Sequence, residues 1–179
     1  VIESETQGFA SVMKSIDLNG DGYDSLFVSS FKANGYEGFI SVYDLDFSGP
    51  VSIDEHAYSL QIQGFIEGWL AGAVGRSFDI GDMTGDGLPD LLVGIEGYEG
   101  GGAIAMLDNE TLLAADSTTP ILLPEDATTL QENISESSYF GNAVKIVEGL
   151  GFLGLSGLDQ TYGLNLETMW FFPDDGDGF

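Results

Sequence analysis

Two nine-residue segments of the chain place oxygen-bearing side chains at a spacing that suits a hard cation. In each segment these side chains stand at positions one, three, five and nine, and glycine stands at position six. Ca2+ takes about 6–8 oxygen ligands, and alternate residues of a tight loop can point inward to supply them. Ordinary turns also favour Asp and Gly, but two copies in similar surroundings favour two metal sites. The candidate ligands are Asp17, Asn19, Asp21 and Ser25 in the first loop, and Asp82, Thr84, Asp86 and Asp90 in the second.

The flanking sequence places both loops between β-strands. An EF-hand loop would carry a bidentate Glu at position twelve and lie between helices, whereas position twelve here is Val28 in the first loop and Val93 in the second. The loops are followed by short apolar runs, 26–28 and 91–93, which are bounded by turn-forming residues. Runs of this length and composition predict buried strands.

The loops belong to a longer repeat with a period of roughly 65 residues,. An alternating stretch that starts with Gly follows each loop, and a segment of small residues and Val precedes each loop. A third, weaker copy begins at Phe140-Gly141 but lacks the Asp ladder. We therefore predict a single all-β repeat domain, 1–179, with an acidic tail at 173–179. Its three units are expected at approximately 8–66, 67–125 and 136–172.

This pattern resembles FG-GAP repeats, the units of the integrin α-subunit β-propeller and of many bacterial surface proteins. The resemblance rests on Phe140-Gly141, the two Asp/Gly loops, the run 91–94 and the glycines 100–102. It implies four-stranded β-propeller-type blades whose loops bind Ca2+, with the position-seven carbonyl of Leu88, and that of Tyr23 in the first loop, as further ligands. Ser25 departs from the pattern, which has Asp at position nine, so the first site is expected to be weaker or to use water.

Length conflicts with a closed ring. Propellers have about 4–8 blades, and three units of this size leave a single-chain ring incomplete. The chain is then a fragment of a larger protein, or several chains combine, or the units stack openly with their edges covered by partners. The last two arrangements both predict self-association, because exposed sheet edges invite pairing.

The composition excludes some functions. The formal net charge is −26, with 30 acidic and 4 basic residues, so no nucleic acid partner is expected, because such a partner needs a basic face. The charge serves solubility in salty water, cation capture, or both. The chain has no Cys and no apolar run long enough for membrane insertion. Weak Ca2+ loops fill at extracellular concentrations, so we expect a protein exported to the cell surface or medium.

No residue set predicts catalysis. His56 is the single histidine, and no other catalytic residue type converges on it, so a surface position is expected. Residues 112–116 are the best candidate for a short helix, but a turn is expected there, and 114–138 are expected to form an exposed link broken by a strand at 121–123. Asn109 and Asn133 begin sequons that matter only in a glycosylating host.

The leading hypothesis is a non-enzymatic, Ca2+-binding protein that acts in adhesion or assembly, through self-association or another extracellular protein. The alternatives are a scaffold fragment of a larger secreted enzyme and a structural subunit of a surface polymer.

Overall fold

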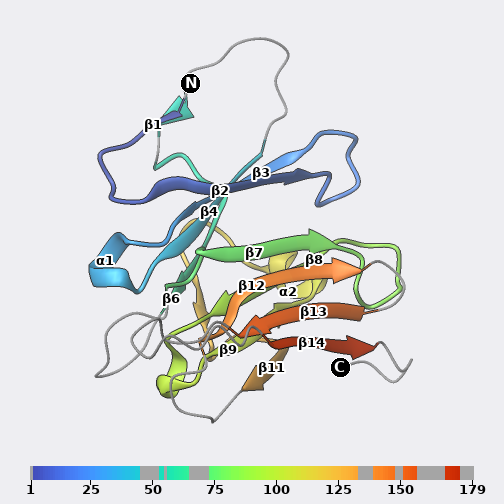
Figure 1. Cartoon of the computed structure of the whole chain (residues 1–179). Coiled ribbons are helices and arrows are strands. Elements are labelled where there is room, and N and C mark those ends of the chain that lie inside the picture. Colours follow the sequence, from blue (N-terminus) through green and yellow to red (C-terminus); the bar gives the residue numbers. More distant parts are fainter. Residues whose placement is uncertain are drawn as a thin grey trace.

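Short strands, most of them rich in apolar residues, build three main sheets, which begin one after another along the chain (Figure 1). The computed structural model describes residues 2–44, 53–54, 56–64, 73–132, 139–147, 151–156 and 168–173. Within these residues the protein is all-β, as the sequence predicts, and every sheet is open.

The first sheet contains the first metal-loop candidate and has the strand order β10-β6-β4-β3-β2. Its neighbours are antiparallel except for β10, which runs parallel to β6. A short helix, α1 (Ala33–Tyr36), connects β3 to β4. The strands are β2 (Phe9–Ile16), β3 (Ser25–Ser30), β4 (Phe39–Asp44), β6 (Leu60–Gly64) and β10 (Ile121–Leu123). A separate pair, β1 (Ile2–Glu3) and β5 (Ile53–Asp54), runs parallel.

The second and third sheets are antiparallel throughout. The second has the order β11-β9-β8-β7 and contains the second loop, while the third has the order β12-β13-β14. The strands are β7 (Ser77–Gly81), β8 (Asp90–Ile95), β9 (Ala103–Leu107), β11 (Thr129–Glu132), β12 (Phe140–Val147), β13 (Gly151–Ser156) and β14 (Thr168–Pro173). A 3-10 turn, η1 (Tyr98–Gly100), precedes β9, and helix α2 (Asn109–Ala114) follows it.

Each later sheet joins the preceding one through the same backbone junction. Gly38 forms a parallel bridge with Val74, and Gly102 forms the equivalent bridge with Phe140. A Cβ atom at Gly38 would lie 2.2 Å from the Val74 carbonyl oxygen, and one at Gly102 would lie 2.1 Å from that of Phe140. Both positions therefore need glycine, and the junction supports a structural repeat.

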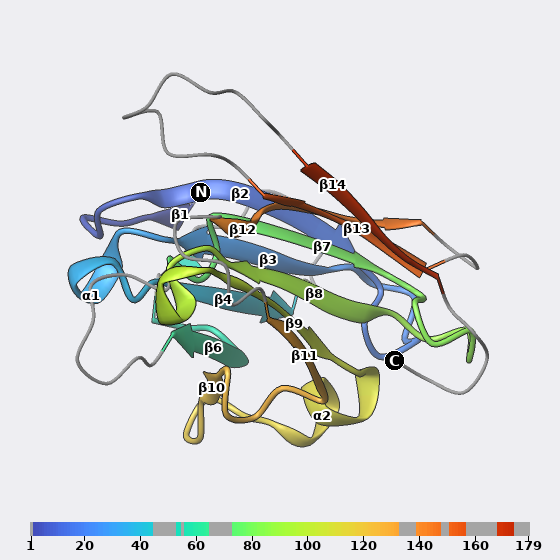
Figure 2. The same ribbon diagram turned by 60° about the horizontal axis from the view of Figure 1, so that its bottom comes forward.

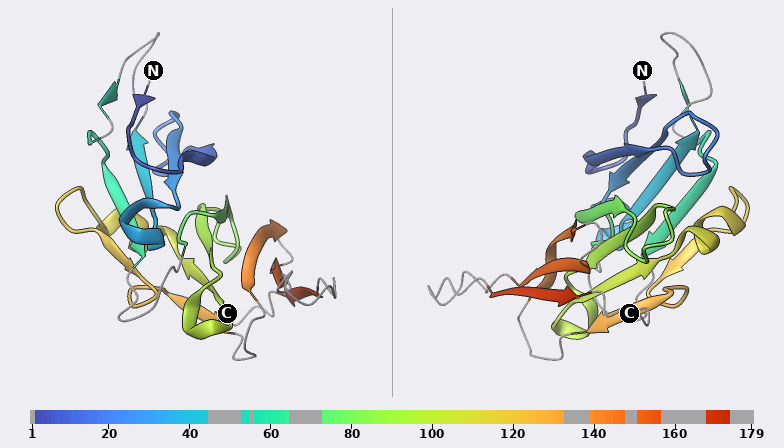
Figure 3. Two further views of the ribbon diagram at one scale, coloured as in Figure 1. Left: turned by 60° about the vertical axis from the view of Figure 1, so that its left-hand side comes forward. Right: turned by 90° about the vertical axis from the view of Figure 1, so that its right-hand side faces the viewer.

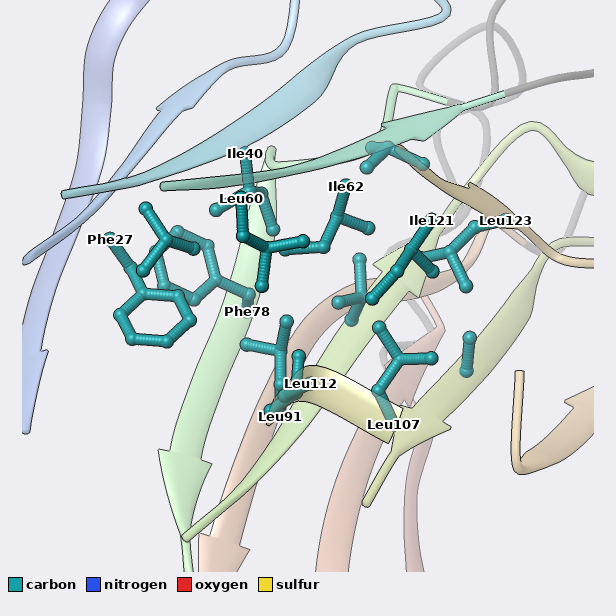
Figure 4. Close-up of a cluster of buried hydrophobic side chains, with 14 of the residues drawn as sticks. Phe27, Ile40, Leu60, Ile62, Phe78, Leu91, Leu107, Leu112, Ile121 and Leu123 are labelled. Carbon is teal, nitrogen blue, oxygen red and sulfur yellow. The ribbon is translucent and has the colours of Figure 1, made fainter. Parts of the chain in front are cut away.

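Two apolar layers hold the sheets together. The larger layer lies between the first and second sheets, and Figure 4 shows side chains of β3, β4 and β6 facing those of β7, β8 and β9. Phe27, Ile40, Leu91 and Leu107 are fully buried there, and each such side chain contributes about 1.5–3 kcal/mol of transfer free energy. The smaller layer joins the second sheet to the third, so the sheets form successive layers (Figure 3).

One buried carboxylate links all three sheets. Asp79 on β7 lies 3.1 Å from the Lys14 ammonium on β2 and 2.5 Å from the Lys145 ammonium on β12, and it also accepts the Ile146 backbone N–H. Burial by itself would raise the pKa of Asp79, but hydrogen bonds from Lys145, the Ile146 N–H and Lys14 outweigh it, and the pKa is lowered,. Asp79 therefore stays ionised and ties together the first strands of the three sheets.

The connection after β9 differs in part from the sequence expectation. Residues 121–123 form the predicted strand, β10, which pairs with β6. The expected turn at 112–116 was wrong, because α2 occupies 109–114 (Figure 2). Its N-terminus is capped by Asp108, whose carboxylate accepts the Thr111 N–H at 2.8 Å,. The expected exposed link also contains β11, which completes the second sheet beyond residue 125.

Candidate metal centre

Both candidate loops occupy the same place in their sheets. The first connects β2 to β3 and the second connects β7 to β8, so both lie between strands as expected. The residue before each loop pairs with position nine, as Ile16 with Ser25 and Gly81 with Asp90. The two loops therefore leave and re-enter their sheets in the same register.

Two hydrogen bonds to the position-one carboxylate recur in both loops, and their lengths agree to within a tenth of an ångström. Asp17 accepts the N–H groups of Gly20 and Gly22 at 2.8 and 2.9 Å. In the second loop, Asp82 accepts those of the equivalent Gly85 and Gly87 at 2.7 and 2.9 Å. These four glycines all have positive φ, between 75° and 88°, which lets the backbone wrap around the position-one carboxylate.

The position-five carboxylates match as well. Asp21 accepts the Tyr23 N–H at 2.8 Å, and Asp86 accepts the Leu88 N–H at 2.8 Å. The side chains of Tyr23 and Leu88 are exposed, so their proposed contribution is restricted to the backbone carbonyl. At position three, Asn19 donates to Asp21 at 3.0 Å.

Position nine distinguishes the two loops. Asp90 is fully buried, and its carboxylate accepts the N–H groups of Met83, Thr84 and Asn109 at 2.8, 3.0 and 3.2 Å. The pKa of Asp90 is raised, because burial and the nearby Asp86 carboxylate outweigh these hydrogen bonds,. Its negative charge is thus only partly compensated by the protein.

In the first loop, a carboxylate from another strand lies beside position nine. The Ser25 hydroxyl donates to Asp44 at the end of β4 at 3.0 Å. Asn19, Ser25 and Asp44 line one hollow of about 130 Å3 beneath the loop. Asp24, the acid next to Ser25, instead accepts the Ser15 hydroxyl at 2.8 Å. Asp44 is therefore better placed than Asp24 to replace the carboxylate that Ser25 lacks.

Asn109, the first residue of α2, connects the two loops. Its side-chain amide donates to the carbonyl oxygen of Leu18 in the first loop at 3.0 Å and to that of Pro89 in the second at 3.2 Å. The residue is only 2% exposed. A glycan on Asn109 is incompatible with this buried, donating amide, whereas Asn133, the other sequon residue, lies outside the described residues.

Sequence reasoning missed Asp44 and Asn109 as parts of the candidate site. A signal was present for both, because each alternating stretch ends in an aspartate, Asp44 or Asp108, and Asn109 follows the second. The Asp–Ser contact at 3.0 Å and the Asn109 bridge depend on tertiary pairing, which the spacing alone does not give.

The donor chemistry fits a hard cation, because every candidate ligand presents oxygen. In the described part of the chain, no three Asp, Glu, His or Cys side chains lie together as a ready-made metal cluster. A bound ion would need the neutral oxygens of Asn19, Thr84 and the position-seven carbonyls besides the carboxylates. Such an ion would supply positive charge where carboxylates are close, and nothing redox-active.

His56 is exposed and lines a different hollow, on the first sheet away from both loops. None of the described helices is long and apolar enough to cross a membrane.

No protein-family model matches the chain, and no curated protein matches its sequence.

Proposed function

We propose that this chain is a Ca2+-stabilised repeat protein of the FG-GAP kind that acts outside the cell in adhesion or assembly. Its sheets are propeller-type blades, and it works through self-association or by binding another protein rather than by catalysis. The strongest support is that the same hydrogen bonds to the carboxylates at positions one and five recur in two Asp/Gly loops, which lie at the same place in two successive sheets.

Ca2+ would be held in the second loop by Asp82, Thr84, Asp86 and Asp90 and by the Leu88 carbonyl. The raised pKa of Asp90 supports this assignment, because a cation there offsets both its burial and its repulsion by Asp86,. The first site would use the oxygens of Asp17, Asn19, Asp21 and Ser25 and the Tyr23 carbonyl, with Asp44 as the added carboxylate.

The metal would act by stabilising the folded state. A ligand that binds only the folded form stabilises it by RT ln(1 + [L]/Kd), which is about 1.8 kcal/mol at roughly twentyfold excess over Kd. For a domain of this size that corresponds to about 4–7 °C in Tm. Loops that bind Ca2+ at millimolar concentration would then be rigid at the same end of successive sheets, where a partner protein would contact them.

The test compares melting and sedimentation in millimolar Ca2+ and in excess EDTA. The double variant Asp82→Asn with Asp86→Asn removes two loop charges, and Glu5→Gln with Glu125→Gln removes the same charge at exposed positions. Wild type and control should melt higher in Ca2+, and the loop variant should lose most of this gain. Equal Ca2+ responses in all three proteins would contradict the metal role. A monomer in both conditions would contradict self-association.

A further inference from the structure

A second hollow lies on the face of the first sheet that points away from the second sheet, which we call the back face. Ser41 and Tyr43 of β4 and Gln61 of β6 form its floor, and Phe9, His56 and Tyr58 contribute to its walls. The opposite side of the same strands carries the apolar side chains of the main core (Figure 4). The hollow has a volume of about 240 Å3.

The lining is chemically unlike the rest of this acidic chain. None of the described residues that line the hollow is Asp, Glu, Lys or Arg, although the protein has 30 acidic residues. Aromatic rings alternate with amide and hydroxyl groups instead. Apart from His56, these described residues offer a charged ligand no opposite charge, so they suit an uncharged one,.

Comparison with the second sheet argues against another sheet as the occupant. In the second sheet, the positions of β9 that correspond to Phe39, Ser41 and Tyr43 hold apolar residues. These are Ala103, Ala105 and Leu107, which pack in the apolar layer against the first sheet. At the same positions β4 carries a hydroxyl and two large rings. A sheet stacked here would bury hydroxyl and amide groups against apolar side chains, which is unfavourable.

The polar groups of the floor are held in place. Gln63 donates to Gln61 at 2.6 Å, and Gln61 donates to Ser41 at 3.1 Å. Ser30, which is fully buried, has the only buried side-chain oxygen in the described structure without a hydrogen-bond partner. It pairs across the strands with Phe9 of the hollow's wall, although Ser30 itself does not line the hollow.

We propose that the hollow binds a single neutral sugar ring. Hydroxyl pairs of a pyranose match amide and hydroxyl side chains, which both donate and accept. The C–H faces of such a ring pack on aromatic rings, whose faces carry negative charge density. The volume lies below the range of about 300–1,000 Å3 for drug-sized ligands, which suits one ring rather than a chain. This site does not depend on the metal loops.

The test uses saturation-transfer NMR and calorimetry with glucose, galactose, mannose and N-acetylglucosamine, and with glucuronate as the charged comparison. Gln61→Leu removes the central amide of the floor, and Gln131→Leu makes the same change on β11, away from the hollow. At least one neutral sugar should bind saturably, and glucuronate should bind less well. Gln61→Leu should weaken binding by about tenfold or more, and Gln131→Leu should not.

A third variant, Tyr58→Ala in the wall, keeps the test decisive if Gln61→Leu does not fold. It should also weaken the sugar, and the Asp82→Asn with Asp86→Asn protein should bind it like wild type. The proposal is overturned if none of the neutral sugars binds at millimolar concentration, if glucuronate binds equally well, or if folded Gln61→Leu or Tyr58→Ala binds like Gln131→Leu.

Discussion

Replacing Asn109 by Ala should destabilise the protein through both candidate loops at once. The wild-type amide donates to the carbonyls of Leu18 and Pro89 at 3.0 and 3.2 Å and is 2% exposed. Alanine removes both donors and leaves the carbonyl oxygens without them. The backbone N–H of residue 109 still reaches Asp90, because that bond does not involve the side chain.

The magnitude follows from these two bonds. A hydrogen bond contributes about 1 kcal/mol net, and a buried group left without its partner costs about 1–3 kcal/mol. The expected loss is therefore about 2–4 kcal/mol, and a loss of about 3 kcal/mol lowers Tm by about 6–12 °C in a domain of this size.

Urea unfolding and thermal melting in EDTA measure this loss without any metal. Asn142→Ala is the matched control, because that side chain is exposed on β12, and it should change stability by less than about 0.5 kcal/mol. A Ca2+ titration of the same variants then shows whether loosening the bridge also weakens the loops. If Asn109→Ala is as stable as the control, the bridge does not hold the loops and the reasoning fails.

Three further predictions concern how the sheets are joined. Asp79→Asn should lower the free energy of unfolding by about 1–3 kcal/mol at neutral pH. Because the pKa of Asp79 is lowered in the folded protein, urea unfolding should show this difference from wild type vanish as pH falls through that pKa. A difference that stays constant with pH would contradict the prediction. Gly94→Ala places a Cβ 1.8 Å from the carbonyl oxygen of Gly141, so hydrogen exchange in the third sheet should accelerate, and unchanged protection would refute the close contact. Leu123→Ala removes a fully buried side chain and should cost about 2–5 kcal/mol in urea unfolding, whereas exposed Leu113→Ala should cost little; equal losses would argue against the docking of β10.

Local chemistry made much of the fold predictable. The apolar runs after each loop became β3 and β8, because several adjacent apolar residues are stable only when buried,. The run 121–123 became β10 for the same reason. Strand β11 was not predicted, since its residues Thr129–Glu132 are mostly polar and its pairing with β9 is what makes it a strand,.

For the candidate site, the sequence predicted only the residues that lie within each loop, and not those that reach it from distant parts of the chain. Spacing alone gave the loop residues, because the loops are closed by their own backbone N–H groups. The partners that come from elsewhere were missed: Asp44 reaches Ser25 across paired strands, and Asn109 reaches Leu18 over 91 residues. Helix α2 overlaps the segment 112–116, which was a helical candidate but for which a turn was preferred. The aspartate three residues before Thr111 was a local signal for the start of this helix,.

The large negative charge of the chain means that Ca2+ could stabilise it in two ways, by general screening or by binding at the loops, and salt experiments distinguish the two. Lys14 and Lys145 both pair with Asp79, and Arg76 pairs with Glu96, so most of the few basic groups already serve carboxylates of the sheets. The remaining negative charge of a chain at −26 must be balanced by ions from solution,. Raising NaCl to about 1 M shortens the screening length to about 3 Å, and this should stabilise wild type and the Asp82→Asn with Asp86→Asn variant alike. Millimolar Ca2+ adds little ionic strength, so a stabilisation by Ca2+ that the variant lacks must come from ions held at the loop. If NaCl at equal ionic strength reproduced the whole Ca2+ effect in wild type, screening would be sufficient and the loops would be ordinary turns.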